Sequence, residues 1–389
     1  MTRASVHEYA ANLRPRYRAA TKGVKTQILN EFCLTTGLHR KAAIRLLGAR
    51  AGPRGGRRGR PRQYGPEVAT VLVQLWEMSD RMCGKLLVAV LPDLLDALTR
   101  HGALETPEEV RAGLLRLSAS TIDRLLRRHR WSVLRQPQRR RGPASGSLKA
   151  QVPLRTWSEW KGAAVGSLQA DLVLHCGEST EGFYLTTLST VDVATGWSEL
   201  EPVWGMGKER VRAALHHVRQ RLPFPLRALH TDNGSEFINH VLVPWCRRER
   251  ISLTRGRSYR KNDQAYVEQR NWLGVRRLVG YDRLATKAAL STLQRLYPLL
   301  GLQMNFFRPV RKLVGKERLG ARVHKRYDAA GTPYQRLLAS GSLTEEAKAD
   351  LERRYLALNP ATLHQQIDQL LRLLWRQGQE ERLAGRKLG

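Results

Sequence analysis

The chain has 389 residues, enough for two to four domains of about 150 residues each. Its 67 Lys and Arg outnumber its 34 Asp and Glu and give a net charge of +33. Such an excess is typical of proteins that bind a polyanion. A hydrophobic content of 42% excludes a disordered basic tail. No apolar run approaches the roughly 18 residues of a transmembrane helix, and residues 1–8 lack a signal peptide's apolar core. We expect a folded cytosolic protein that faces nucleic acid and has no membrane partner.

The four cysteines, Cys33, Cys83, Cys176 and Cys246, are far apart and form no CxxC pair. This spacing excludes a disulfide scaffold and a structural zinc site built on paired cysteines. We expect four buried, reduced thiols.

Residues 1–50 predict a helix-turn-helix DNA-binding domain. Apolar residues recur at helical spacing, Gly37 interrupts them, and the helical pattern resumes over 38–47. In that geometry Ile44 and Leu47 pack inward. The side chains expected to meet DNA are His39, Arg40, Lys41 and Arg45. A helical hairpin with solvated charges is the alternative.

Residues 51–65 are a basic linker, too rich in Gly, Pro and Arg to be buried. Residues 58–61 read Arg-Gly-Arg-Pro and resemble an AT-hook, in which Arg58 and Arg60 enter the minor groove of A·T-rich DNA. Phosphate contacts without sequence preference are the alternative.

Residues 66–133 predict a second helical, helix-turn-helix DNA-binding domain. A serine cap near residue 118 starts a short basic helix. The residues of this second candidate recognition helix that we expect at DNA are Ser120, Arg124, Arg127 and Arg128. A linker over 134–160 follows.

Residues 161–285 change to a pattern of strands and helices. Strands are predicted near 172–174, 183–191, 197–200, 227–230 and 251–254, and helices at 208–221, 239–250 and 265–279. This alternation indicates an α/β layer fold.

Three acidic residues stand at informative places in this segment. Asp171 lies in the first strand, Asp232 follows the fourth, and Glu268 sits in the first turn of the last helix, with 35 residues between Asp232 and Glu268. The stretches around the last two, HTDNGSEF and NDQAYVEQRN, are more specific than the spacing. Taken singly, the three could be a buried acid paired with Arg, a turn residue and a helix-end acid.

These residues resemble the integrase catalytic core of bacterial insertion-sequence transposases and retroviral integrases, the D,D(35)E group with an RNase H-like fold. The resemblance covers about 165–285. It implies a multidomain DNA transposase, with an all-α helix-turn-helix N-terminal region, an α/β RNase H-like core, and a basic C-terminal region with an amphipathic helix. It also implies that Asp171, Asp232 and Glu268 are the catalytic, metal-binding triad. The sequence departs from many family members, which carry Pro and Gly before the glutamate, and it lacks the retroviral His/Cys zinc module.

Such a triad would hold two Mg²⁺ ions, or Mn²⁺ in their place, because these ions prefer oxygen ligands. Two ions about 3.5–4 Å apart stabilise the entering and leaving oxygens of an in-line displacement. The resemblance assigns Asp171 to both ions. The expected reaction is cleavage at the element ends, followed by attack of the freed 3′-hydroxyl on target DNA.

Other charged residues of the core have expected roles of their own. We expect Arg260, Lys261 and Arg270 to face DNA phosphates, with solvated charge as the alternative. Asp192 is interpreted as part of a hairpin's structure, and Glu236 as a local helper of the site.

Residues 286–389 form the predicted basic C-terminal arm and helices. Residues 304–327 interleave cations with aromatics, which suits a DNA-backbone surface, or else form an arm over the core. After Asn359-Pro360 comes an amphipathic helix, for which packing within the chain is favoured over joining protomers. Its apolar face consists of Leu363, Ile367, Leu370, Leu371 and Leu374.

The expected partners are double-stranded DNA, as terminal inverted repeats and target, and further copies of the chain in a homo-multimer on DNA. The expected location is the bacterial cytosol or nucleoid. Two other functions compete: a non-catalytic DNA-binding relic or repressor with the same fold, and an RNase H-like nuclease or resolvase. The first would show no metal-dependent nicking, and the second would not need residues 1–133.

Overall fold

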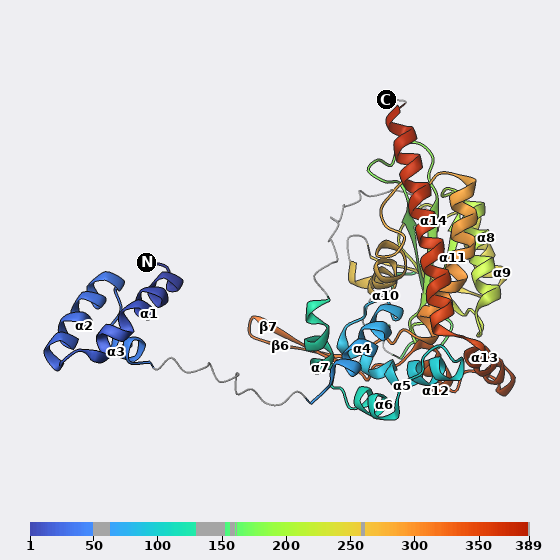
Figure 1. Ribbon diagram of the computed structural model, residues 1–389. Coiled ribbons are helices and arrows are strands. Elements are labelled where there is room, and N and C mark those ends of the chain that lie inside the picture. The colour runs from blue at the N-terminus through green and yellow to red at the C-terminus, as the bar shows by residue number, and fades with distance from the viewer. Residues whose placement is uncertain (50–62, 130–151, 156–159, 161, 258–260, 388–389) are drawn as a thin grey trace. The chain divides into compact units, whose positions relative to one another are not determined.

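The computed structural model describes residues 1–49, 63–129, 152–155, 160, 162–257 and 261–387 (Figure 1). The chain divides into two compact units, Met1–Gln63 and Tyr64–Gly389. Arg58, Arg60 and Arg260 fall outside the described residues. Among the helices that are described, none is both long and apolar enough to cross a membrane.

The first unit is built from three helices. They are α1 (Arg3–Ala19), α2 (Lys22–Thr36) and α3 (Arg40–Gly48). Phe32 of α2 is fully buried, and the ring of Tyr9 stacks on it with 5.4 Å between centroids. Helix α2 ends at Gly37, whose φ of +70° is a left-handed conformation that glycine adopts without steric cost. The two helices predicted on either side of Gly37 are confirmed.

Helix α3 buries a narrower face than predicted. Leu47 is fully buried with Ala43, four residues earlier, as expected for one helix face. Ile44 is 43% exposed, so the prediction that it packs inward is wrong. A residue one step along a helix from a buried position is turned about 100° away from it.

Four helices open the second unit. They are α4 (Pro66–Met78), α5 (Gly84–Arg100), α6 (Glu108–Leu115) and α7 (Ala119–Leu125). Helix α7 docks on α5 where Gly84 donates its backbone N–H to Oδ1 of Asp123 at 2.8 Å. A Cβ at Gly84 would lie 2.3 Å from the carbonyl oxygen of Ala119, so only glycine permits this approach.

These four helices belong to the same compact unit as the sheet. Helices α4 and α5 pack against the C-terminal helix α14 (Pro360–Lys387). Asp80, in the turn after α4, forms ion pairs with Arg308 at 2.5 Å and Arg277 at 3.5 Å. The described helices of the predicted 66–133 domain, α4 to α7, therefore share one compact unit with the α/β core.

The central sheet has five strands, in the order β3-β2-β1-β4-β5. They are β1 (Ser167–Leu174), β2 (Thr186–Asp192), β3 (Ser198–Val203), β4 (Ala228–Thr231) and β5 (Ser252–Arg255). Strands β1, β2 and β3 are antiparallel neighbours, whereas β4 is parallel to β1 and to β5. The predicted mixed α/β core is confirmed.

Helices cover the sheet and fix its edges. They are α8 (Lys208–Arg221), α9 (Leu242–Arg248), α10 (Ala265–Arg270) and α11 (Lys287–Phe306). Helices α8 and α11 pack along β3, and α10 lies on β1 and β2. Because side chains alternate along a strand, Gln169 and Asp171 of β1 share a face, and both contact the segment around α10.

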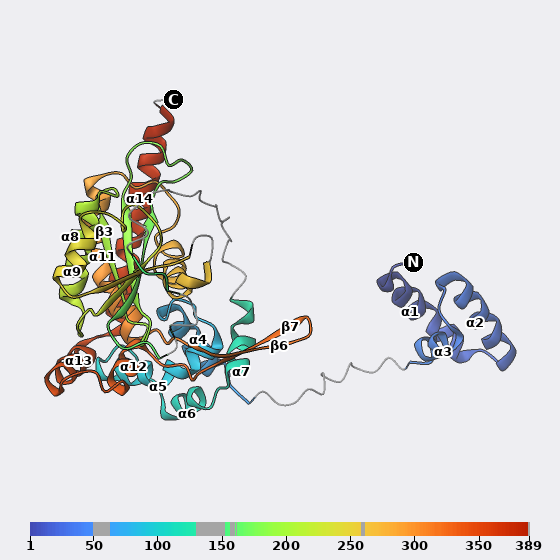
Figure 2. The ribbon, with the colours of Figure 1, turned by 180° about the vertical axis from the view of Figure 1, so that it is seen from behind.

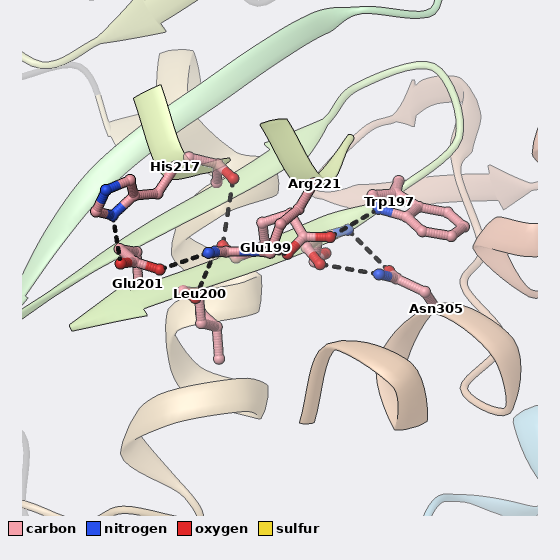
Figure 3. Close-up of polar contacts among 9 residues, drawn as sticks. Trp197, Glu199, Leu200, Glu201, His217, Arg221 and Asn305 are labelled. Carbon is pink, nitrogen blue, oxygen red and sulfur yellow. Dashed lines mark hydrogen bonds and ion pairs between the residues drawn. The ribbon is translucent and has the colours of Figure 1, made fainter. Parts of the chain in front are cut away.

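A buried polar network attaches α8 and α11 to β3 (Figure 3). Arg221, the last residue of α8, donates to Glu199 at 3.1 Å and to Glu201 at 2.7 Å. Asn305 of α11 exchanges two hydrogen bonds with the backbone of Ser198. Burial raises the pKa of the Glu199 carboxyl, although Arg221 beside it acts in the opposite direction.

The C-terminal part adds α12 (Pro333–Ala339), α13 (Glu345–Ala357), α14 and the hairpin strands β6 (Leu313–Leu319) and β7 (Arg322–Tyr327). The apolar face of α14 is buried against α11, which confirms packing within the chain. Phe306 and Phe307 are also buried, beside Tyr355. The prediction of an aromatic DNA surface over 304–327 is therefore wrong for these two residues.

The cysteines are free, as predicted, but are not all buried. Cys246 is buried, and burial raises the pKa of its thiol to about 12. Cys33 and Cys176 are half-buried and Cys83 is exposed, so the prediction of four buried thiols is wrong for these three.

Candidate active site

Asp171 lies on β1, and Asp232 stands directly after the neighbouring strand β4. In the parallel register of β1 and β4, the last pair is Gln169 opposite His230. Asp171 and Asp232 are each two residues farther along the chain, beyond that last pair. Parallel strands are about 4.8 Å apart, and residues at the same level point to the same face of the sheet. If the register continues at the same spacing, it predicts that the first two acids lie near each other at this end of the strands.

Local hydrogen bonds orient both carboxylates, which are half-buried. Oδ2 of Asp171 accepts a 2.7 Å hydrogen bond from Nδ2 of Asn271. Oδ1 of Asp232 accepts from the backbone N–H of Gly234 at 2.9 Å, a local turn that aspartate favours. Asn233 continues this loop by donating to the carbonyl of Gly256 at 2.8 Å, so the loop after β4 is tied to the end of β5.

Glu268 is exposed on α10, the helix that lies on β1. The buried side chain of Gln169 makes this connection: its Oε1 accepts from the backbone N–H of Val267 at 3.2 Å, and its Nε2 donates to the carbonyl of Asp263 at 3.0 Å. Gln169 therefore fixes the start of the Glu268 helix two residues from Asp171 along β1.

Helix α10 widens directly after Glu268. Residues Asn271–Arg276 form a π-helical turn, a feature frequently found at functional sites. Residues three apart on a helix are neighbours on its surface. Because Asn271 contacts Asp171, this spacing predicts that Glu268 lies toward the same side of α10.

An ion pair between the exposed Arg257 and the buried Asp263 holds the connection between β5 and α10. Asp263 is fully buried, and the guanidinium of Arg257 donates to both of its oxygens at 2.9 Å. The backbone N–H of Arg257 adds a third hydrogen bond at 3.1 Å. This geometry, with two parallel charge-assisted bonds, is both strong and directional.

The donor chemistry suits Mg²⁺, but the ligands are not gathered. In the described residues no group of three or more His, Cys, Asp or Glu side chains is arranged to hold a metal ion. Three clustered carboxylates repel one another unless a cation neutralises them. Oδ1 of Asn271 is buried without a hydrogen-bond partner. Such an unsatisfied acceptor beside Asp171 is compatible with a water or cation.

The predicted DNA-contacting residues that the structure describes are mostly exposed. They are His39, Arg40, Lys41 and Arg45 at the start of and along α3, and Ser120, Arg124, Arg127 and Arg128 on α7 and the turn after it. His39 caps α3 by accepting from the backbone N–H of Lys41 at 3.3 Å. Their DNA contacts remain predictions. Lys261 lies in the 3-10 turn Lys261–Gln264 before α10.

Arg270 is not a surface residue. It is 4% exposed and donates to the carbonyl of Gly196 at 2.9 Å. Burial, together with the nearby charge of Arg308, lowers its pKa to about 9. The prediction that Arg270 faces DNA phosphates is therefore wrong for this conformation, because the residue points from α10 into the interior.

Asp192 has the structural role predicted for it. Its carboxylate accepts from the backbone N–H groups of Gly166, Ser167 and Thr195, and from the Thr195 hydroxyl. It is fully buried, and this burial raises its pKa. These bonds close the turn between β2 and β3, away from any exposed surface.

Three residues at the site were not predicted: Gln169, Asp263 and Asn271. Gln169 stands two positions before Asp171, which places it on the same face of a strand. Asn271 stands three positions after Glu268, which places it on the same face of a helix. Those spacings could have indicated both residues. Nothing local indicates the burial of Asp263.

No protein-family model matches the chain. A solved structure to which it is similar is the catalytic core domain of BIV integrase, with a TM-score of 0.28 and 19% sequence identity, covering 46% of this chain and 96% of that chain. Because this similarity is so low, the fold is assigned from the strand order of the chain and not from this comparison. The uncharacterized protein y4rM of Sinorhizobium fredii is 46% identical over 321 residues, which cover 82% of this chain and 91% of that protein. The chain belongs to the same family as y4rM.

Proposed function

We propose that the chain is a DNA transposase that cuts the ends of a mobile element and joins the freed 3′-hydroxyl to target DNA. The observation that supports the proposal is the parallel pairing of β1, which carries Asp171, with β4, which Asp232 follows, together with the packing of the Glu268 helix α10 on β1. The order β3-β2-β1-β4-β5, with three antiparallel strands and two parallel ones, supports an RNase H-like core.

In this proposal Asp171, Asp232 and Glu268 hold two Mg²⁺ ions, which stabilise charge on the entering and leaving oxygens of the phosphodiester when bound. Asn271 orients the Asp171 carboxylate through its 2.7 Å hydrogen bond. Gln169 and Asp263 hold α10 in place. Glu268 is exposed, so its side chain can turn toward the aspartates without disturbing the core.

The charge of the chain supports a DNA substrate. A net charge of +33 favours a polyanion, and exposed arginines lie on α3 and at the end of α7. Joining two element ends to one target requires more than one active site, so we propose that copies of the chain assemble on DNA.

The test uses the full chain and duplex DNA carrying the inverted repeats expected at the ends of the element. With Mg²⁺ or Mn²⁺ we expect cleavage at the repeat ends and joining to a target plasmid. Asp171→Asn, Asp232→Asn and Glu268→Gln should each lower the rate at least about a thousandfold. The control is Glu209→Gln, which removes an exposed acid on α8. Undiminished cleavage by Asp232→Asn would contradict the proposal.

A second function has one observation in its favour. Because the described carboxylates are not gathered into a ligand set, a DNA-binding protein without catalysis fits the same fold. Calorimetric titration with Mn²⁺ separates the two. A transposase should bind the ion and lose that binding in Asp171→Asn, whereas a relic should bind DNA but neither bind the ion nor cut.

A further inference from the structure

The hairpin of β6 and β7 projects from the second unit (Figures 1 and 2). All of β7 is exposed, and so is β6 apart from Leu313 and Gly315. The turn is tight: Leu319 pairs with Arg322, and Gly320 has a φ of +60°, as two-residue hairpin turns with glycine first require. A two-stranded hairpin is at best marginally stable alone in water, and neither face of this one joins a core.

Among the described residues, the polar contacts that anchor the hairpin lie at its base. Oδ1 of Asp328 accepts from the backbone N–H of Lys312 at 2.6 Å, just before β6. Oδ2 of the same residue pairs with Arg336 of α12 at 2.8 Å. Lys312 also donates to the carbonyl of Ala194 at 2.9 Å. These contacts hold the start of β6 and the end of β7 to the body and leave the distal part of the hairpin exposed.

From the Lys316–Lys325 pair to the turn, one face of the hairpin carries three cations and one valine. Lys316 stands directly opposite Lys325, and Arg318 opposite Val323. Like charges directly opposite one another destabilise a strand pair. No ion pair involves these three cations in the part of the chain that the structure describes. This arrangement is unfavourable in the free protein and becomes favourable against an anionic partner.

We propose that the β6–β7 hairpin enters the major groove of double-stranded DNA, with Lys316, Arg318 and Lys325 directed to the phosphates. The proposal rests on the proposed function and names a surface that grips its substrate. At about 3.3 Å per residue the strands are roughly 20 Å long, and the major groove, about 12 Å wide, admits a two-stranded ribbon. Val323, 42% exposed near the turn on the same face as these cations, is placed to contact base edges.

The test compares two triple variants with the same loss of charge. In Lys316→Gln/Arg318→Gln/Lys325→Gln the hairpin loses its cationic face. In the control, Lys348→Gln/Arg353→Gln/Arg354→Gln, α13 loses three cations that pair with its own Glu345 and Asp350. Binding to a labelled 30-base-pair duplex is followed by fluorescence anisotropy in EDTA at several NaCl concentrations, so that no cleavage occurs.

We expect the hairpin variant to bind the duplex at least about tenfold more weakly than the intact chain at 0.1 M salt. The plot of log K against log salt should become less steep, with the magnitude of its slope smaller by about 2 to 3, since each phosphate contact contributes about 0.9. The control should match the intact chain. Both variants should keep the melting temperature and far-UV spectrum of the intact chain, because the changed side chains are not part of a hydrophobic core.

Two results would overturn the proposal. One is that the hairpin variant and the α13 control bind the DNA duplex with equal affinity and equal salt dependence. In that case the cations only keep the edge strands from pairing with other chains, and the hairpin variant alone should aggregate in gel filtration. The other is tighter binding to a matched RNA duplex, whose deep major groove side chains cannot read. Since binding is measured without metal, an intact chain that binds through the hairpin but never cuts would disprove only the transposase function.

Discussion

Asn271 and Asp171, 100 residues apart in the chain, are joined by a 2.7 Å hydrogen bond between side chains. The donor follows the helix of Glu268 and the acceptor lies on the central strand β1. This one contact therefore couples two parts of the candidate site. It also leaves the carbonyl oxygen of Asn271 buried and without a partner.

Replacing Asn271 with alanine should impair catalysis more than folding. We expect Asn271→Ala to lower the rate of metal-dependent DNA cleavage about 10- to 100-fold, as for other residues that orient a metal-binding carboxylate. The Mg²⁺ concentration for half-maximal rate should rise, while DNA binding in EDTA stays the same. The control is Gln269→Ala, which removes an exposed amide from the same helix. An unchanged Mg²⁺ requirement would contradict the orienting role.

Gln169 should matter both for the stability of the fold and for the position of helix α10. Gln169→Leu keeps the volume but leaves the N–H of Val267 and the carbonyl of Asp263 without their buried partner. Unsatisfied buried groups cost about 1–3 kcal/mol each, so we expect the free energy of unfolding to fall by about 2 kcal/mol or more in urea denaturation, together with cleavage activity. Gln220→Leu, at an exposed site on α8, serves as the control and should change neither quantity.

The sequence predicted those elements that local patterns determine. Helix α8 spans the predicted 208–221, since an amphipathic period runs up to two prolines. Strand β2 begins at Thr186, three residues later than predicted. The reason is distant in the chain: the backbone N–H of Leu185 bonds to the carbonyl of Leu284 at 2.7 Å, so this residue leaves the ladder.

The site divides in the same way. The sequence predicts Asp171 within a strand and Asp232 after another strand, and the fold pairs these two strands in parallel. The burial of Arg270 and Asp263 depends on residues of other elements that pack around them. The residue type alone does not indicate this burial. The packing of the 66–133 helices on the core depends on contacts such as Asp80 with Arg308, which are 228 residues apart.

The network in Figure 3 predicts a pH-dependent stability defect. In Arg221→Met, Glu199 keeps its burial but loses its cationic partner. Breaking a buried pair costs about 3–5 kcal/mol. Because the Arg221 side chain is 33% exposed, we expect about 2 kcal/mol at pH 7.5.

The defect should shrink in acid. Burial already raises the pKa of Glu199 above its ordinary value, and losing Arg221 raises it further. The protonated carboxyl needs no partner, so the difference in unfolding free energy between the variant and the parent should be smaller at pH 4.5 than at pH 7.5. Arg219→Met, which breaks a more exposed pair with Glu249, is the comparison. A defect of equal size at both pH values would contradict burial of a charged Glu199.

His175 predicts a loss of stability in acid. It follows β1, is fully buried and hydrogen-bonds to Thr187 at 2.7 Å. Burial, helped by the charge of Arg276, lowers its pKa to about 3 from 6.5. Between these values the unfolded chain binds a proton that the folded chain excludes, so stability is full above pH 6.5 and falls as the pH drops. At about 1.4 kcal/mol per pH unit, the loss attributable to His175 at pH 5 is about 2 kcal/mol.

The variant His175→Leu tests this loss by urea denaturation. Between pH 7 and pH 5 its free energy of unfolding should decline by about 2 kcal/mol less than that of the parent. Thr187 keeps Tyr297 as a hydrogen-bond partner in this variant. His240→Gln, at an exposed site, should decline as the parent does. Parallel pH profiles for the parent and His175→Leu would show that His175 does not resist protonation in the folded chain.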